Sequence, residues 1–226
     1  MSIALVLAVV CWFAASRPRQ DAQARASAQD AVYEVVVRDA FASMHSKATE
    51  LVFDENLNTG IDPASGSSPK DACMEAVQQE ISRHRYEPIL NTIADKAYRL
   101  IARGAGDYSI RADTIQDFAK QVCIGGRLPE TFHTDLPRTF ISPDSIAFDF
   151  IEGPDGTKSP EIFKQVYPGA SGIISLSRVG FDSRQDEAMV STSFVCGGLC
   201  GDGHVYVLRK KSGRWSVVNA WLEWIS

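Results

Sequence analysis

The spacing of apolar residues changes near residue 125 of the chain. Before this point apolar positions recur every three to four residues, the period of a helix with one buried face. After it, β-branched and aromatic residues stand between Gly and Pro positions, which is typical of strands and turns. Helices are predicted over about 28–46, after Ser68, after Pro88 and around 115–122. Strands are predicted near 138–142, 172–179, 188–195, 203–209 and 214–223.

This order of elements predicts an α+β fold in which N-terminal helices pack on a C-terminal antiparallel β-meander over about 172–226. A short strand over 51–53, a surface loop over 56–68 and a short helix containing Phe163 and Val166 complete the expected elements. A chain of 226 residues is long enough to bury one sizeable core. We therefore expect a single domain.

Two local signals indicate where elements begin and end. The segment from Lys210 to Gly213 lies between two apolar stretches and predicts a hairpin loop. Asp113 followed by Gln116 resembles a capping box, in which the two side chains would satisfy free amides at a helix start.

Three tryptophans close the chain. Trp215 and Trp221 are six residues apart and are expected to share one strand face, whereas Trp224 turns to the other face unless a bulge intervenes. Packing in the core is the expected role of this cluster, ahead of an aromatic binding platform.

The N-terminal segment has features of a targeting sequence. The apolar run over 3–15 spans only about 20 Å as a helix, less than the hydrocarbon thickness of a bilayer. This length favours a signal peptide, with small residues suited to cleavage at 14–16 or 22–24. Arg17 and Arg19 follow the run and no basic residue precedes it, which is the reverse of a secretory leader and leaves a retained anchor or a buried helix open.

The expected organisation is therefore a signal peptide or N-terminal membrane anchor over 1–24, followed by one α+β domain over 25–226. The protein is expected to be extracytoplasmic, whether periplasmic, secreted or anchored.

The cysteine count supports an oxidising compartment. Besides Cys11 in the apolar run there are four cysteines, an even number. Among the three possible connectivities we favour Cys196 with Cys200, across a tight loop, and Cys73 with Cys123, between two helices. A four-thiolate zinc site is the alternative, but paired ligands usually have C-x-x-C spacing, so no metal and no cofactor is predicted.

The charge distribution argues against nucleic acid as a partner. The formal net charge is -5, and Lys and Arg are scattered apart from a short basic run over 209–214. Phosphate binding needs clustered cations, so no nucleic acid is expected, and the membrane is expected to be met only through the N-terminal segment.

A resemblance enters through motifs in the C-terminal half. In order, these are Phe163, Tyr167-Pro168, Ser171-Gly172-Ile173-Ile174, Ser177-Arg178-Val179-Gly180-Phe181, Cys196-Gly197-Gly198-Leu199-Cys200-Gly201, Gly213-Arg214-Trp215 and Trp224-Ile225-Ser226. With them the chain resembles a family of uncharacterised bacterial extracytoplasmic proteins, which implies export but no assigned reaction. The long loop over 56–68 and the pair Cys73 and Cys123 depart from that pattern.

The closing meander is also similar, more weakly, to the cone-shaped folds of nuclear transport factor 2, in which a curved sheet wraps a pocket. This similarity implies a pocket on the concave face of the sheet.

Arg178 is the first candidate for ligand binding. It stands among apolar strand positions, where a guanidinium needs an acceptor, and on a concave face it would bind a carboxylate or phosphate. The structural alternative, which we favour, is that it holds loop carbonyls or pairs with Asp182 or Glu187.

Ser177 and His204 are the remaining candidates. With Asp202 they can be written as a hydrolytic set, and Asp202 and His204, two apart on a strand, would share a face. No strand-to-helix elbow surrounds Ser177, so we name no catalytic residue.

The glycines around the Cys196–Cys200 loop are explained by the turn. No Lys-Ser or Lys-Thr follows them and no helix begins there, which argues against a phosphate loop. Tolerance of positive φ in a disulfide-closed turn accounts for Gly197, Gly198, Gly201 and Gly203.

Together these observations favour a non-catalytic module of the cell envelope that binds a small ligand or an envelope protein. A secreted or periplasmic hydrolase using Ser177 or His204 and a purely structural envelope protein are the alternatives. The enzyme reading is disfavoured because no convincing acid, base, nucleophile or metal set is present.

Overall fold

The sheet and its covering helices come from segments spread along the whole chain. The computed structural model describes residues 3–41, 47–57, 73, 110–142, 160–197 and 200–226. The elements are α1 (Ile3–Val36), the π-helical segment η1 (Val37–Phe41), β1 (Leu51–Asp54), α6 (Ala112–Ile124), β2 (Arg138–Ile141), α7 (Pro160–Val166), β3 (Ile173–Leu176), β4 (Gly180–Phe181), β5 (Glu187–Gly197), β6 (Cys200–Lys211) and β7 (Arg214–Ile225). The α+β prediction is confirmed.

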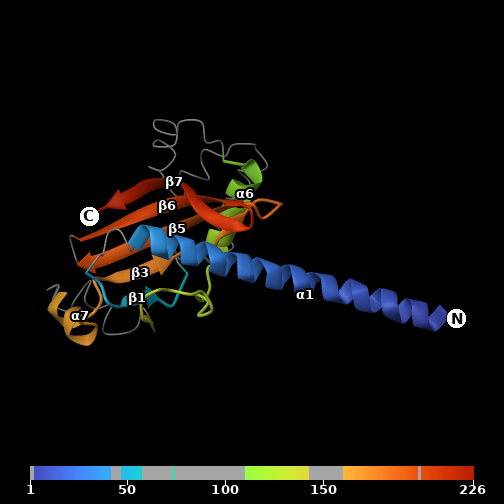
Figure 1. The fold of residues 1–226 in the computed structure, drawn as a ribbon, viewed down its shortest axis with the longest axis horizontal. Helices are drawn as coiled ribbons and strands as arrows, with labels where there is room; N and C mark the ends of the chain where they lie inside the picture. Colours follow the sequence, from blue (N-terminus) through green and yellow to red (C-terminus); the bar gives the residue numbers. More distant parts are fainter. Residues whose placement is uncertain (1–2, 42–46, 58–72, 74–109, 143–159, 198–199) are drawn as a thin grey trace.

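One seven-stranded sheet has the order β2-β1-β3-β5-β6-β7, with β4 paired to β5 (Figure 1). The pairs β3–β5, β5–β6 and β6–β7 are antiparallel, as predicted for the meander. The strand predicted over 51–53 becomes β1, which pairs in parallel with β2 and with β3. The sheet is therefore mixed at one end, because parallel neighbours need long connections and β1 is far from both partners in sequence.

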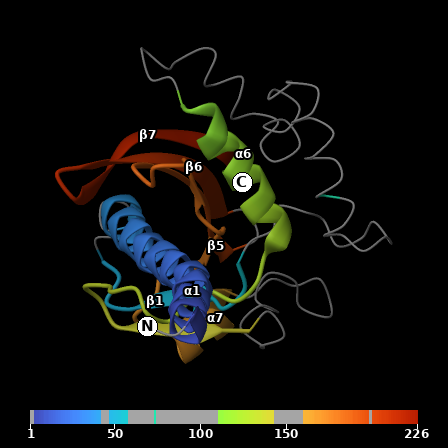
Figure 2. The same cartoon turned by 90° about the vertical axis from the view of Figure 1, so that its right-hand side faces the viewer.

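The C-terminal half of α1 packs on the inner face of the sheet, the face around which the strands curve (Figure 2). Val32, Tyr33 and Val36 are fully buried there, in one apolar cluster with strand residues such as Val190 and Leu208. The prediction of a helix over 28–46 is correct in its buried face, but α1 begins at Ile3, and after Val36 it is followed by the π-helical η1. Met44 lies outside the described residues.

The N-terminal part of α1 projects away from the body of the protein (Figure 1). Its side chains are described from Gln20, and residues 20–24 are exposed, whereas Ala28 is already buried. Arg25 is the first of these side chains to reach another element: its guanidinium donates to Asp117 Oδ2 at 2.6 Å and to the carbonyl of Val179 at 3.0 Å. In the described part of the chain, no helix combines the length and apolarity needed to cross a membrane.

The outer face of the sheet, opposite α1, carries α6 and α7. Phe118 and Val122 of α6 pack on Met189, Val207 and Trp221. The helix predicted around Phe163 is α7, and that side chain is buried in a separate small cluster beneath β1 and β3. Neighbouring residues of a strand, such as Met189 and Val190, contact α6 and α1 respectively, so the two helices lie on opposite faces of the sheet.

The strand ends differ from the predictions in two places. The strand expected over 172–179 is shorter, β3, and a separate strand that was not predicted, β4, follows it and pairs with another part of β5. The loop between Lys210 and Gly213 narrows to a two-residue turn, in which Ser212 and Gly213 have φ of 52° and 80°. Two successive positive φ values match the right-handed twist of a hairpin.

The capping-box prediction is wrong. The helix α6 begins at Ala112, with Arg111 as N-cap and no side-chain cap bond. Asp113 is therefore inside the first turn, and its Oδ2 accepts the backbone N–H of Ser183 at 2.9 Å. The Asp113 carboxylate therefore makes a tertiary contact with Ser183 in place of the helix-cap contact that the local pattern predicted.

The tryptophan prediction is corrected by two bulges in the β6–β7 pair, between Gly203 and His204 and between Val207 and Leu208. As a result Trp215 packs in the cluster on the inner face, while Trp221 packs against α6 on the outer face. Trp224 lies on the same outer side as Trp221, over the β6 glycines.

These glycines also correct the explanation based on positive φ. Gly201 and Gly203 do not have positive φ. A Cβ on Gly203 would stand 2.1 Å from Trp224 Nε1, and one on Gly201 would stand 3.1 Å from the same indole. The tryptophan ring therefore excludes a side chain at Gly203, and at Gly201 the ring does so together with the Phe194 carbonyl oxygen, 2.8 Å from the added Cβ. The remaining predictions on 58–72, on the helix after Ser68 except Cys73, and on the helix after Pro88 fall outside the described residues.

Candidate functional site

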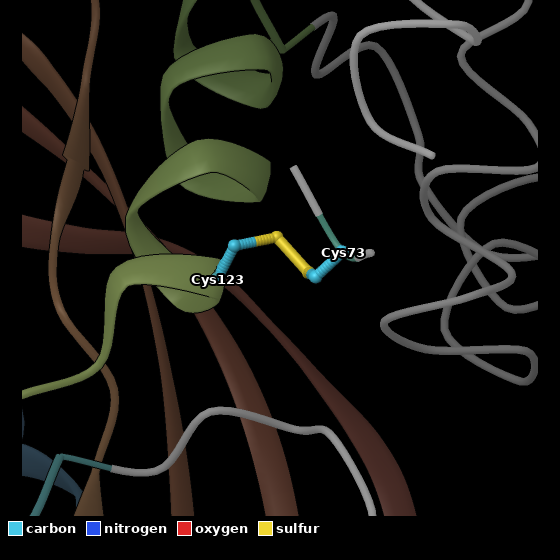
Figure 3. Close-up of a disulfide and its surroundings, with 2 residues drawn as sticks. All are labelled: Cys73 and Cys123. Atoms are coloured by element: carbon cyan, nitrogen blue, oxygen red, sulfur yellow. A yellow bond between two sulfur atoms is a disulfide. The ribbon is translucent and has the colours of Figure 1, made fainter. Parts of the chain in front are cut away.

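Both predicted disulfides are present. Cys73 bonds to Cys123 on α6 with Cα atoms 5.7 Å apart (Figure 3), and Cys196 bonds to Cys200 with Cα atoms 5.1 Å apart. Cys123 is 1% exposed, whereas Cys200 is exposed at the surface. Disulfides of this kind are typical of an oxidising compartment.

Arg178 holds a loop, as the structural alternative proposed. Its Nη1 donates to the carbonyl of Gly125 at 2.9 Å, just after α6. Its Nε is buried without a hydrogen-bond partner among the described groups. The carboxylates considered as its partners, Asp182 and Glu187, bind other arginines.

Ser177 and His204 are not brought into contact. The hydroxyl of Ser177 is buried, accepts the N–H of Ser191 at 2.9 Å and donates to the carbonyl of Arg178 at 3.0 Å. On β6, His204 Nδ1 lies 3.0 Å from Asp202 Oδ1, so the expected shared face of those two residues is confirmed. A serine whose hydroxyl is committed to the backbone lacks the base that a nucleophile requires.

The Asp202–His204 pair lies beside two further polar side chains on the inner face, Tyr206 and Thr192. Burial, with help from the Asp202 charge, raises the pKa of Tyr206 to about 12, although a hydrogen bond with Thr192 opposes the shift. The phenol is therefore neutral at physiological pH. In the part of the chain that the structure describes, no group of three or more His, Cys, Asp or Glu side chains is placed to hold a metal ion.

A second polar centre, on the outer side, was not predicted. Glu187 is fully buried, and its Oε1 accepts the backbone N–H of Arg111 at 2.7 Å and the Thr114 hydroxyl at 2.9 Å. Its Oε2 accepts Arg209 Nε at 2.9 Å. This carboxylate thus binds the N-terminus of α6, where the helix dipole favours negative charge.

Asp182 completes this outer network. Its Oδ2 pairs with Arg111 at 2.7 Å, and its Oδ1 accepts the N–H groups of Asp186 and Glu187 at 2.8 and 2.9 Å. Burial disfavours the charge, but these two amides and the Arg111 guanidinium outweigh it and lower the pKa of Asp182. These groups hydrogen-bond or pair with one another, so the network attaches α6 to the β4–β5 turn. A more open hollow of about 350 Å³ with a mainly polar lining lies beside it, next to Asp117 and Ser183.

A cavity of about 320 Å³ lies beside η1, at the end of α1. Its lining residues come from three segments: Glu34, Val37, Arg38 and Phe41; Ala48 and Leu51; and His133, Thr134, Asp135 and Leu136. Single-turn π-helical insertions in helices occur frequently at functional sites. The volume is at the lower end of the range of ligand pockets.

The cavity combines an apolar floor with one available carboxylate. Val37, Phe41 and Leu51 are buried and line it. Glu34 accepts the N–H of His133 at 2.9 Å through Oε1, and it makes no ion pair within the described residues. The other charged lining groups have local partners, because Arg38 pairs with Asp39 and His133 lies 3.9 Å from Asp135.

The sequence could not reveal this cavity. Two of its three lining segments are about 80 to 100 positions away from the third, and none of them carries a motif. The fold and site describe an α+β domain with a helix-filled inner face and a small amphipathic cavity at the end of that helix. No family model, no curated protein and no solved structure matches the chain.

Proposed function

We propose that this protein is an exported, disulfide-braced domain that binds a small amphipathic ligand, without catalysis, in the cavity beside η1. The observation that carries the proposal is the cavity itself, with buried Val37, Phe41 and Leu51 facing one carboxylate, Glu34, that has no cationic partner among the described residues. A few placed polar groups in an otherwise apolar pocket are the usual composition of small-molecule sites.

The chemistry of the lining favours a ligand with an apolar part and an amine. A carboxylate next to apolar side chains gains most from a hydrogen-bonded cation, since a charged pair in partly desolvated surroundings interacts more strongly than in water. An anionic ligand would face Glu34 and Asp135 across a cavity whose one arginine already pairs with Asp39.

The export part of the proposal rests on the N-terminal segment and on the disulfides. Residues 20–24 are exposed, and Arg25 is the first of the described side chains to make a tertiary contact, so removal of 1–24 would leave the buried face of α1 in place. Two disulfides would persist only in an oxidising compartment.

The test is a thermal-shift titration of the purified protein with a matched pair of probes, phenethylamine and 3-phenylpropanoate. The two share an apolar ring and differ in charge. We expect phenethylamine to raise the melting temperature, since a ligand at 100 times its dissociation constant adds about 2.7 kcal/mol to the free energy of unfolding. The carboxylate probe should have a smaller effect.

Variants locate the binding. Leu136→Trp, which fills the cavity, should abolish the shift, and Glu34→Gln, which keeps an acceptor for His133, should reduce it. The control is Glu55→Gln, which changes a carboxylate paired with Arg127 away from the cavity. No shift with either probe, or an unchanged shift in Leu136→Trp, would reject this site and leave a structural envelope role as the better description.

A further inference from the structure

The two disulfides differ in how an external thiol can reach them. Cys123, in the last turn of α6, is buried and its partner Cys73 is half-buried, whereas Cys200 is exposed and Cys196 is half-buried at the end of the β5–β6 pair. Thiol–disulfide exchange requires a thiolate to approach one sulfur, so access decides which bond reacts. Under native conditions the Cys196–Cys200 bond is therefore the reactive one.

The two bonds also differ in what the fold would lose without them. Cys196 and Cys200 are only four positions apart, and the strands they join are already paired from Glu187↔Arg209 to Val195↔Gly201. Cys73 and Cys123 are separated by 50 positions, so their bond closes a long loop. In the chain-entropy description a short loop contributes less than a long one. The β5–β6 hairpin should thus remain folded when its disulfide is open.

The Cys196–Cys200 disulfide lies on the same face of the sheet as the cavity beside η1. Cys196 packs against the apolar cluster of the inner face, which also contains Phe194 and Phe41. The rings of these two phenylalanines are 6.1 Å apart, and Phe41 lines the cavity beside η1. Phe194 and Phe41 thus connect the disulfide to the cavity on the inner face, whereas the charged network lies on the outer face.

We infer that Cys196–Cys200 is a thiol-exchange site that an external dithiol opens and that an external disulfide closes by the reverse exchange, while Cys73–Cys123 stays closed. A thiolate of the partner attacks Cys200 Sγ, a new sulfur–sulfur bond forms, and the Cys196–Cys200 bond breaks with its electron pair on Cys196 Sγ, which takes a proton from water. The second thiolate of the partner then attacks the partner's own sulfur in the mixed disulfide. Cys200 leaves as a thiolate and takes a proton from water. Two electrons pass to this protein, and the partner dithiol becomes a disulfide.

The test uses the full oxidised protein and dithiothreitol as the probe. The protein is incubated without denaturant, quenched with an alkylating agent at intervals and mapped by mass spectrometry. We expect Cys196 and Cys200 to be alkylated at least tenfold faster than Cys73 and Cys123, with an unchanged far-ultraviolet circular dichroism spectrum. Equal rates, faster loss of Cys73–Cys123, or reduction of Cys196–Cys200 only after unfolding would overturn the inference.

Matched single variants provide a second measurement that does not depend on reduction. Cys196→Ser leaves Cys200 as a free thiol, and Cys73→Ser leaves Cys123 as one. With glutathione disulfide, the folded Cys196→Ser protein should gain a glutathione at Cys200 at least tenfold faster than the folded Cys73→Ser protein gains one at Cys123, as mapped by mass spectrometry. An unreactive Cys200 in a folded protein would contradict the proposed site whether or not the cavity binds a ligand.

Discussion

The two faces of the sheet hold their helices by different means. On the inner face, α1 packs mainly through apolar side chains, and the buried Tyr33 phenol among them donates to the carbonyl of Ser177 at 2.8 Å. On the outer face, α6 has a smaller apolar cluster and adds buried carboxylates, arginines and a disulfide. Every described charge of the outer network has a partner, whereas the inner side ends at a cavity with Glu34 available.

This difference separates structure from candidate function. Buried charges with complete sets of partners fix an element in one position, and removing one partner is costly. A small opening with an apolar wall and one available carboxylate can accept a guest. The outer face is thus expected to respond to mutation through stability, and the cavity through binding.

The largest expected effect concerns the disulfide that anchors α6. Replacing Cys73 and Cys123 together with Ala removes a cross-link over 50 positions and should lower the free energy of unfolding by about 4 kcal/mol, against about 2 kcal/mol for the pair Cys196 and Cys200. Urea unfolding monitored by fluorescence measures both. If the short-loop pair proved the more costly to lose, the proposed division of roles between the disulfides would fail.

The next effect concerns Glu187. Glu187→Gln removes the buried charge that Arg209 and the start of α6 share, and should cost about 2 to 3 kcal/mol, because hydrogen bonds to a charged acceptor are stronger than those to a neutral one. The matched control is Glu55→Gln, whose partner Arg127 is largely exposed and which should cost less than about 1 kcal/mol. Equal midpoints of urea unfolding for the two variants would show that the outer network does not stabilise the attachment of α6.

On the inner face, Tyr33→Phe removes one buried hydrogen bond and leaves the carbonyl of Ser177 without it. We expect a loss of about 1 to 2 kcal/mol in the free energy of unfolding. Tyr167→Phe, at a partly buried tyrosine beside α7, is the control and should have little effect. Melting curves of the two variants that superimpose would mean that water or another donor replaces the Tyr33 hydroxyl.

The smallest effect is a change in acid stability. The pKa of Asp182 is lower in the folded protein than its ordinary value, so its contribution is complete above that ordinary value, near pH 4, and is lost as the pH falls through the folded value. Asp182→Asn should therefore flatten the fall in stability below about pH 4. Urea midpoints from pH 3 to 7 test this, and an unchanged slope would assign acid sensitivity to other carboxylates.

The sequence correctly predicted the features that depend on the period of apolar residues within an element and on the spacing of the cysteines. The buried stripe of α1, the antiparallel strands and both disulfides follow from residues that recur at fixed intervals or stand in suitable pairs. The sequence did not predict contacts that depend on register and on distant segments. Asp113 was assigned to a cap but binds Ser183, and one bulge moved Trp221 to the outer face while a second placed Trp224 on that same face.

Glu187 shows the same limit. A carboxylate at the start of an apolar strand segment indicates a buried charge, but not which of the chain's arginines would meet it. The candidates for ligand binding, Arg178, Ser177 and His204, were chosen by residue type, whereas the cavity is lined by other residues that three separate segments bring together.

The most direct test of the division between the two faces is a two-dimensional amide NMR titration of the protein with phenethylamine. We predict saturable shifts at Val37, Arg38, Leu51 and Leu136, with Asp113 and Phe181 on the outer side unchanged. Shifts confined to the outer network, or no saturable shifts at all, would contradict the assignment of binding to the cavity at the end of α1.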